Sequence, residues 1–467
     1  MKDYGTKGIV RTSSKIYLDE SFDYDKGFWL GYTNSPSPAY KVRVSGIPKD
    51  GVLNYTGGSW INLINGINEL PARTNTEEIR GFVAQTPNVD WSKLVIEQIP
   101  EYEGSFVTDG VNDMIVSQNT VEEMGITDEF TVVSMIHQIT LRGATAAALT
   151  NYIRQPIGYE YVRNHVANIG KTGIYGYAVY DVNHSNANNS HVINTILGDK
   201  NDYSIHITGN LSQGKFSVQG YINSDNNIVE LSQVAWYWTF IAKRVLTTDE
   251  INQVIAYYNL DKYVKPDIYY NVKKQGLTND TPDEDWYLKD FSGNGRDMTL
   301  YNYARTPESG INEEGGLQSD GVDDYGQFVG DLGLKDYTVA VDRAYQDENV
   351  NCVPFISSVG RTGGAPFLME MVHPTSHVTY PYSFGTPTES VVLNSSRQIS
   401  YQSTYVYNRN SIARGNSVKT GDGLTIGSNE GVSQYSKLCL WSFLLFPYTL
   451  SEFLLERQMK KRKLGTL

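Results

Sequence analysis

The chain has 467 residues, of which 40% are hydrophobic and 19% charged, with a formal net charge of −13 and two cysteines. Its length favours two or three domains, and its acidity argues against a nucleic-acid groove, which needs a basic face. Two cysteines provide neither a disulfide framework nor metal-ligand spacing, and no stretch approaches the roughly 18 apolar residues of a membrane span.

Residues 1–80 are predicted to form a β-rich module of short strands separated by turns, serving attachment or assembly. Residues 41–45 (Lys-Val-Arg-Val-Ser) alternate between polar and apolar types, the pattern of a half-buried strand. No basic start followed by an apolar run marks a signal peptide, so we expect synthesis in a cytoplasm.

One pattern occurs twice in the rest of the chain. Residues 106–113 read Phe-Val-Thr-Asp-Gly-Val-Asn-Asp, and residues 317–324 read Leu-Gln-Ser-Asp-Gly-Val-Asp-Asp. Each is an apolar strand that leads into an Asp-Gly turn, and an alternating apolar run follows each, at 130–133 and at 337–341. Two markers in one order at similar separation indicate an internal duplication.

Each copy also closes in the same way, with a strand of bulky residues before a short helix. The strands are predicted at 236–240 and 438–441, and the helices open with Thr247-x-x-Glu250 and Thr449-x-x-Glu452. Thr-x-x-Glu is a capping box, in which hydroxyl and carboxylate satisfy backbone N–H groups. Since strands and turns recur about every 8–12 residues, each copy is predicted to be a β-sandwich. The predicted domains are 81–264 and 285–467, with a linker at 265–284.

The second copy opens with a turn that the first lacks, Asp-Phe-Ser-Gly-Asn-Gly at 290–295. This turn, the Ser-Asp-Gly-Val-Asp-Asp motif at 319–324 and the late strand with its capped helix resemble the concanavalin A-like, laminin-G-type jelly roll. The resemblance covers residues 85–467. It implies an all-β chain: the N-terminal β-rich module, then two tandem jelly-roll sandwiches that each end in a short helix.

The Tyr- and Asn-rich texture, including Lys-Pro-Asp-Ile-Tyr-Tyr-Asn-Val at 265–272, is similar to virion proteins of tailed phages of gut Bacteroidales, including the crAss-like group. This resemblance implies a non-enzymatic virion structural protein, a head fibre or capsid decoration. It implies other virion proteins as partners, above all the major capsid protein, and a homo-oligomer, for a fibre a trimer. The alternative is a tail-associated or displayed adhesin that binds surface glycans.

A glycoside hydrolase is the third alternative. Such an enzyme needs two carboxylates that flank the scissile bond, about 5–5.5 Å apart for retention. In jelly-roll hydrolases a Glu-x-Asp-x-x-Glu strand supplies them, and this sequence contains no such strand. Glu370 is a lone acid in an apolar run. We therefore predict no catalytic residues, no enzymatic activity and no organic cofactor.

The candidate metal ligands are Asp109 and Asp113 in the first copy and Asp320 and Asp324 in the second. Calcium binds six to eight oxygen atoms, and laminin-G sites recruit acids near strand ends. In the alternative interpretation, which we favour, the Asp before Gly accepts backbone hydrogen bonds within the turn.

Aromatic and basic residues are assigned as follows. The candidates for sugar-stacking platforms are Trp29, Trp60, Trp91 and Trp286. Because they lie in strands beside core residues, Trp236, Trp238, Trp441 and the Cys439 thiol are assigned to the core. The run Lys-Lys-Arg-Lys at 460–463 is assigned to a helix C-terminus, where cations interact favourably with the helix dipole.

Overall fold

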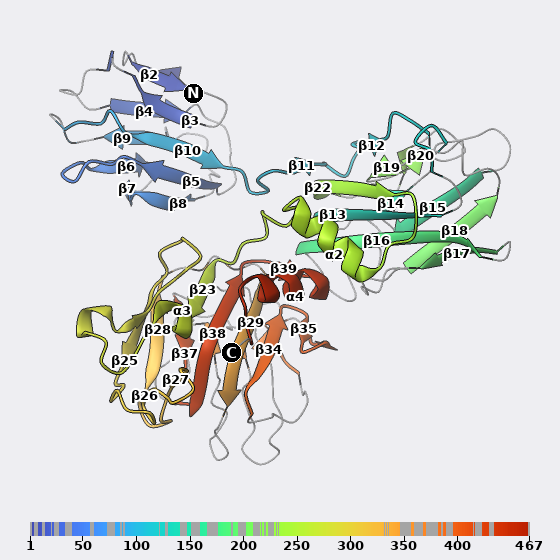
Figure 1. Ribbon diagram of the computed structural model, residues 1–467. Coiled ribbons are helices and arrows are strands. Elements are labelled where there is room, and N and C mark those ends of the chain that lie inside the picture. Colours follow the sequence, from blue (N-terminus) through green and yellow to red (C-terminus); the bar gives the residue numbers. More distant parts are fainter. Residues whose placement is uncertain are drawn as a thin grey trace. The chain divides into compact units, whose positions relative to one another are not determined.

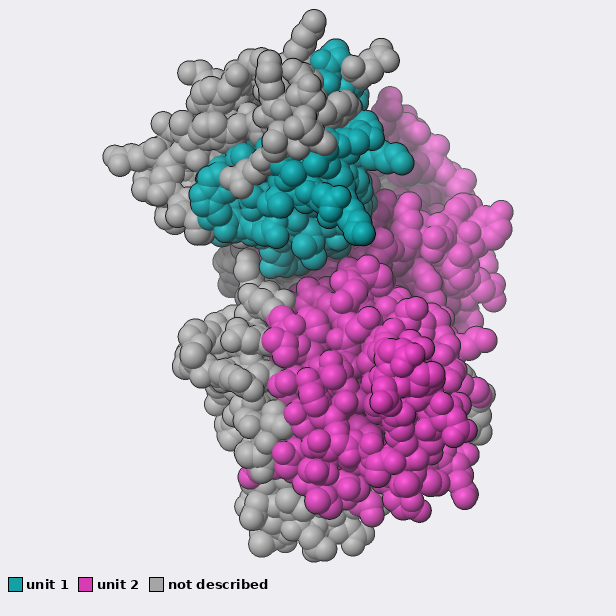
Figure 2. Space-filling model, turned by 90° about the vertical axis from the view of Figure 1, so that its left-hand side faces the viewer, with its two compact units in different colours: residues 1–103 teal, residues 104–467 magenta. Residues whose placement is uncertain are grey.

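The computed structural model (Figure 1) is all-β with short helices, which confirms the predicted fold class at the level of antiparallel β-sandwiches. The chain divides into two compact units, Met1–Glu103 and Gly104–Leu467 (Figure 2). No helix in the described part of the chain is long and apolar enough to span a bilayer. The structure describes all residues except 1, 4–7, 12–14, 20, 23–27, 33–39, 57–59, 72–79, 85, 87–88, 121, 127–128, 141–146, 151–158, 166–175, 188–189, 195–201, 209–214, 216, 219–220, 223–227, 230, 232, 331, 333, 335, 346–355, 359–367, 370–381, 384–385, 389–395, 414, 416–422, 429–433 and 466–467.

The first unit contains two five-stranded antiparallel sheets. Across the first sheet, the order is β1 (Lys2–Asp3), β4 (Phe28–Tyr32), β9 (Arg80–Ala84), β6 (Leu53–Thr56) and β7 (Trp60–Leu63). Across the second sheet, it is β2 (Ile9–Arg11), β3 (Lys15–Leu18), β10 (Val95–Ile99), β5 (Tyr40–Ser45) and β8 (Gly66–Leu70). The predicted strand at 41–45 is confirmed as part of β5, where Val42 and Val44 are buried in the core with Trp91. The unit continues past the predicted boundary at residue 80 because β9 and β10 lie inside its two sheets.

The first copy of the duplicated pattern builds two main sheets. The strand order in the first sheet is β11 (Phe106–Val107), β22 (Gln233–Ala242), β13 (Phe130–Thr140), β16 (Gly176–Ala187) and β17 (Ser190–Asn194), and β39 (Thr449–Leu450) also pairs with β16. The strand order in the second sheet is β12 (Ile115–Val116), β19 (Ser217–Val218), β14 (Ala147–Thr150), β15 (Tyr159–His165) and β18 (Asp202–Thr208). A two-stranded ribbon, β20 (Tyr221–Ile222) and β21 (Ile228–Val229), is separate from both.

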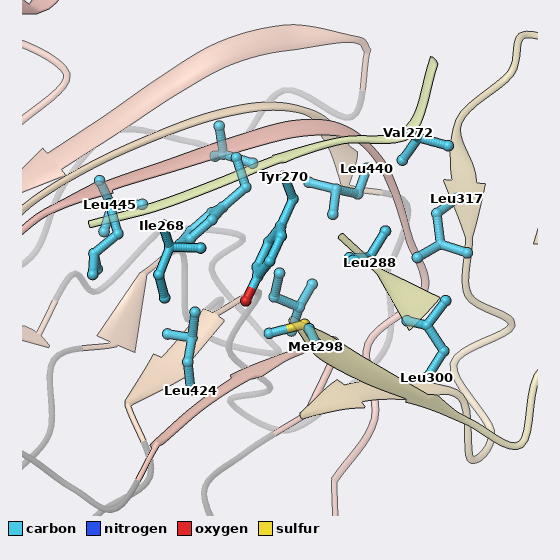
Figure 3. Close-up of a cluster of buried hydrophobic side chains, with 14 of the residues drawn as sticks. Ile268, Tyr270, Val272, Leu288, Met298, Leu300, Leu317, Leu424, Leu440 and Leu445 are labelled. Atoms are coloured by element: carbon cyan, nitrogen blue, oxygen red, sulfur yellow. The ribbon is translucent and has the colours of Figure 1, made fainter. Parts of the chain in front are cut away.

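The second copy builds two eight-stranded sheets. The strand order in the first sheet is β26 (Gly310–Ile311), β27 (Leu317–Gln318), β38 (Leu438–Phe446), β29 (Thr338–Tyr345), β34 (Gln398–Ser403), β35 (Val406–Tyr407) and β36 (Asn410–Ser411), and β23 (Ile268–Asn271) also pairs with β38. The strand order in the second sheet is β24 (Tyr287–Leu288), β25 (Met298–Tyr301), β28 (Tyr325–Val329), β37 (Gly423–Ile426), β30 (Ile356–Ser358), β31 (Leu368–Met369), β32 (Tyr382–Ser383) and β33 (Thr386–Pro387). Side chains of both sheets, such as Leu440 and Leu424, meet in one hydrophobic core (Figure 3). The helices that the structure describes in residues 104–467 are α2 (Thr248–Tyr257), α3 (Val272–Gln275), α4 (Glu452–Lys461) and a 3-10 helix at Asp283–Asp285.

The two copies correspond at the level of single hydrogen bonds. β11 pairs with β22 as β27 pairs with β38. Just after the short strand, Thr108 Oγ1 accepts the N–H of Val234, and Ser319 Oγ accepts the N–H of Leu438, each at 3.1 Å. The long strands β22 and β38 each carry a bulge at the corresponding position. These shared contacts support the internal duplication that the sequence markers predict.

The closing helices begin differently. α2 begins at the predicted capping box, in which Thr247 and Glu250 satisfy each other's backbone N–H groups. The predicted cap of the second helix at Thr449 is wrong, because Ser451 is the N-cap of α4. Thr449 lies instead in β39, where pairing with β16 keeps the backbone extended.

The predicted linker at 265–284 contains a core strand. Ile268 and Tyr270 of β23 are fully buried, and β23 pairs along β38. Figure 3 shows both side chains inside the core, where the Tyr270 ring stacks on Phe443 with centroids 5.7 Å apart. Because alternate residues of this segment fill the core, it belongs to the second sandwich.

A second hydrophobic cluster joins the two copies. It includes Val133, Met135 and Val179 from the first copy, Ile251 and Ile255 from α2, and Leu444, Phe446, Phe453 and Leu454 from the second copy. β39 also pairs in parallel with β16. Arg457 of α4 donates from Nη1 to Oδ1 of Asn252 in α2 at 2.6 Å. Residues 104–467 therefore pack as one unit rather than as two sandwiches tied by a flexible linker.

The stability of this junction is expected to depend on pH through His137 of β13. Its ring meets Tyr177 edge-on, with centroids 4.6 Å apart, and burial lowers its pKa from 6.5 to about 3. The unfolded state therefore binds more protons than the folded state between these two values, so stability falls as pH drops from 6.5 towards 3. The variant His137→Phe removes this contribution. We expect its thermal-unfolding midpoint to decline less than that of the wild type over this range; equal pH slopes would contradict the prediction.

Candidate functional site

The four sequence-predicted metal ligands lie in two turns with matching hydrogen bonds. In the first turn, Asp109 Oδ1 accepts the N–H of Val111 at 2.7 Å, and Asp113 Oδ2 accepts the N–H of Asp109 at 2.9 Å. In the second turn, Asp320 Oδ1 accepts the N–H of Val322 at 2.7 Å, and Asp324 Oδ2 accepts the N–H of Asp320 at 3.0 Å. This bonding is what the turn interpretation predicts.

The second turn also brings together three carboxylates. One oxygen from each of Asp320, Asp323 and Asp324 lies within 4.8 Å of the others, whereas the first turn has Asn112 in place of the middle acid. Calcium needs six to eight oxygens, and backbone N–H groups already occupy oxygens of Asp320 and Asp324. The three acids alone therefore make an incomplete calcium site, and the turn interpretation stays the one that we favour.

A pH and calcium titration of Asp324→Asn separates the two interpretations. Asp324 is fully buried, and burial raises its pKa from 3.8 to about 6. The raised pKa means that its contribution to stability is present below pH 3.8 and is lost as pH rises through 6. We expect Asp324→Asn to be more stable than the wild type above pH 6, and calcium to leave both melting temperatures unchanged. A calcium-dependent rise in the wild type that is absent in Asp324→Asn, but retained in the matched variant Asp113→Asn, would instead establish a metal site.

Two of the four predicted aromatic platforms are buried. Trp91 is 0% exposed and Trp286 is 8% exposed, so neither can stack on a sugar. Trp60 is 59% exposed, and the side chain of Trp29 lies outside the described residues, as do Glu370 and Cys352. The prediction that Cys439 is a buried thiol is confirmed, because the residue is 0% exposed and burial raises its pKa to about 12.

The candidate site is a cavity of about 510 Å³ in the second sandwich, which we call the Trp441 pocket. Strands β23, β29 and β38, helix α3, the β26–β27 loop, the residue before β34 and the end of α4 supply its lining. The lining residues are Tyr269, Asn271, Lys273, Lys274, Glu314, Asp342, Arg397, Trp441, Ser442, Lys461, Arg462 and Lys463. All of them belong to the second compact unit.

A β-bulge places Trp441 in this pocket. Ser442 pairs with Asp342 of β29 and Leu440 pairs with Arg343, so Trp441 is the extra residue. Leu440 and Phe443 both point into the core, which leaves two consecutive residues, Trp441 and Ser442, lining the pocket. A bulge re-aims side chains in this way because it interrupts the alternation of the strand.

An ion pair covers the tryptophan. Arg397 donates from Nε and Nη2 to the two carboxylate oxygens of Asp342, at 3.0 and 2.8 Å. Its guanidinium also lies over the Trp441 ring, 4.1 Å from the centroid. Asp342 is 2% exposed and also accepts the N–H of Gly465 at 3.0 Å, which holds the end of the chain against the sheet.

Two basic segments form the cationic side of the pocket. Lys273 and Lys274 lie in the last turn of α3, and Lys274 Nζ lies 4.9 Å from the centroid of the Tyr269 ring. The run 460–463 ends α4, and three of its four residues line the pocket. The chain turns at Lys463, whose φ is +56°, and the N–H of Leu464 donates to the Met459 carbonyl oxygen. The run is thus both a helix C-terminus, as predicted, and part of the pocket.

The Asp290 turn holds the strand that supplies Tyr269. Asp290, which is 7% exposed, accepts the backbone N–H groups of Tyr269, Ser292 and Arg296 at 3.0, 2.8 and 3.1 Å. The turn that distinguishes the second copy in sequence is therefore the support of one pocket wall.

No family model and no curated protein matches the chain. Among solved structures, it is similar to a Trypanosoma rangeli sialidase in complex with sialic acid, with 11% identity over 98% of this chain and 84% of the sialidase and a TM-score of 0.30. It is also similar to a binding domain of botulinum neurotoxin DC in complex with SialylT, with 10% identity over 90% and 94% of the two chains and a TM-score of 0.23. Similarities of this size carry no argument about the activity of this chain.

Proposed function

We propose that this chain is a non-enzymatic carbohydrate-binding protein and that the Trp441 pocket is its binding site. The observation that carries the proposal is the pocket itself. Its volume of about 510 Å³ lies within the range of small-ligand sites, about 300–1,000 Å³. Its lining offers amide, hydroxyl, carboxylate and ammonium groups, which are the donors and acceptors that sugar hydroxyls require.

The absence of catalysis belongs to the same proposal. Two carboxylates line the pocket, Glu314 and Asp342. Asp342 is bound on both oxygens by Arg397 and is almost completely buried, so it is unsuited to act as an acid, base or nucleophile. A hydrolase would need two available acids, one on each side of the bond.

For the biological setting, we propose display on a virion as a head fibre, a capsid decoration or a tail-associated adhesin. The sequence resemblance to Bacteroidales phage proteins supports this setting. The shared hydrophobic cluster of the two copies also suits a display role, because it keeps residues 104–467 in one packed unit. In this setting the partners would be other virion proteins, the major capsid protein among them, and the protein would assemble as a homo-oligomer.

A glycan microarray probed with the full-length protein tests the carbohydrate proposal. We expect selective binding to a subset of glycans, and release of no reducing sugar from the bound ones. Binding to no glycan would overturn the carbohydrate function and leave a purely architectural virion protein.

Light scattering of the full chain and of a variant lacking residues 1–103 tests the assembly proposal. We expect a trimer that dissociates on truncation, and a monomer in both forms would contradict the proposal.

A further inference from the structure

The lining of the Trp441 pocket has the opposite charge to the chain as a whole. The chain carries a formal charge of −13, yet six of the twelve lining residues are Lys or Arg and two are acidic. One of the two acids, Asp342, is already bound by Arg397 and by the N–H of Gly465. Lysines from two separate segments line the cavity: Lys273 and Lys274 of α3, and Lys461 and Lys463 at the end of α4, where Lys461 Nζ also lies 3.8 Å from Asp261 Oδ1. A concave surface with one dominant sign of charge concentrates ligands of the opposite sign.

The aromatic residues of the pocket do not offer open ring faces. Trp441 is 7% exposed and Tyr269 is 6% exposed. Arg397 covers the Trp441 ring, while Lys274 and Arg462 lie 4.9 and 5.9 Å from the Tyr269 centroid. A neutral sugar that binds by stacking would need those ring faces. Cations, rather than rings, are thus what the pocket presents to a ligand.

The cations come from separate places in the sequence, and the fold holds both groups in place. α3 ends at Gly276, which adopts a left-handed φ of +74° and fixes the end of the turn that carries Lys273 and Lys274. At the other side, Leu464 is 5% exposed and anchors the turn that follows Arg462 and Lys463. Ammonium groups have three rotatable donors and bind oxyanions as point charges.

We infer that the ligand of the Trp441 pocket is an acidic sugar, one that bears a carboxylate or sulfate group. This inference rests on the proposed carbohydrate function and specifies its ligand class. The anionic group lies among the lysines of α3 and of the α4 end, and the sugar hydroxyls face Asn271, Ser442 and Glu314.

The test is calorimetric titration of the full-length protein with glucuronate, N-acetylneuraminate and glucose 6-sulfate, and with glucose and inorganic sulfate as comparisons. The test variant is Lys273→Gln/Lys274→Gln. The control variant, Lys243→Gln/Lys289→Gln, makes the same change of charge at exposed residues of the same unit that do not line the pocket. Circular dichroism and melting temperature establish that both variants are folded.

We expect at least one acidic sugar to bind the wild type more tightly than glucose or sulfate does, and more weakly as salt is added. Its affinity should fall about tenfold or more in the α3 variant, because charge-assisted contacts are lost, and stay within about twofold in the control. If glycans bind on the array but neutral ones bind as well as acidic ones, and the α3 variant keeps full affinity, the acidic-ligand inference is overturned while the carbohydrate function stands. Sulfate binding as tightly as any sugar also overturns the inference. Absence of binding to every glycan overturns both proposals.

Discussion

Replacement of Arg397 by alanine is expected to lower the free energy of unfolding by about 2–3 kcal/mol, because the Asp342 carboxylate is buried although the Arg397 side chain itself is 23% exposed. Asp342, 2% exposed, would keep the N–H of Gly465 but lose both guanidinium hydrogen bonds, and its carboxylate would stay buried without a counter-charge. The Trp441 ring would also lose the cation that covers it. Urea unfolding followed by tryptophan fluorescence measures the change.

Two further variants identify the cause of this loss. Arg397→Lys keeps the positive charge but not the bidentate hydrogen bonding of the guanidinium, so its loss of stability should lie between those of the wild type and Arg397→Ala. The double variant Asp342→Asn/Arg397→Ala removes the stranded charge and should recover part of the stability. A loss below about 0.5 kcal/mol in Arg397→Ala, the size of an ordinary surface substitution, would mean that the pair is solvated and would contradict this description of the pocket.

Replacement of Asp290 by alanine is expected to lower the free energy of unfolding by about 3 kcal/mol, the second large effect, because three backbone N–H groups lose their acceptor together. One of these belongs to Tyr269, so the strand that forms a pocket wall loosens and ligand affinity falls as well. Asp290→Asn keeps a carbonyl oxygen that can accept the N–H groups of Tyr269 and Ser292, so its free energy of unfolding should fall by only about 1 kcal/mol. Equal losses in the two variants would show that charge, and not the hydrogen-bonded turn, is what the fold requires.

The strands and the duplication were predictable from sequence because their signals are local. The Asp-Gly turns are built by side chains that bond their own backbone, and the first capping box lies within four residues. The second cap was mispredicted for a non-local reason: Thr449 pairs with β16, more than 250 residues earlier in the chain, so the helix starts at Ser451. In the same way, the predicted linker at 265–284 contains strand β23, whose pairing partner β38 lies more than 150 residues later in the chain.

The pocket could be predicted only in part. The basic run 460–463 was visible, but nothing in the sequence places it beside Lys273 and Lys274. The sequence assigns Trp441 to the core, and the residue is indeed buried, at 7% exposure; what the sequence does not show is that it also lines the pocket. The bulge between Asp342 and Arg343 changes the direction of its side chain, and a bulge depends on the pairing of two distant strands. The local signal that could have drawn attention to it is Ser442, the one hydroxyl residue within an otherwise apolar strand.

A crystal structure of the full-length protein soaked with the acidic sugar that binds most tightly tests the central claim most directly. The account predicts one sugar in the Trp441 pocket, with its anionic group within hydrogen-bonding distance of lysines from α3 or from the end of α4. A sugar bound at another surface, such as around the exposed Trp60, with the Trp441 pocket empty, would contradict it.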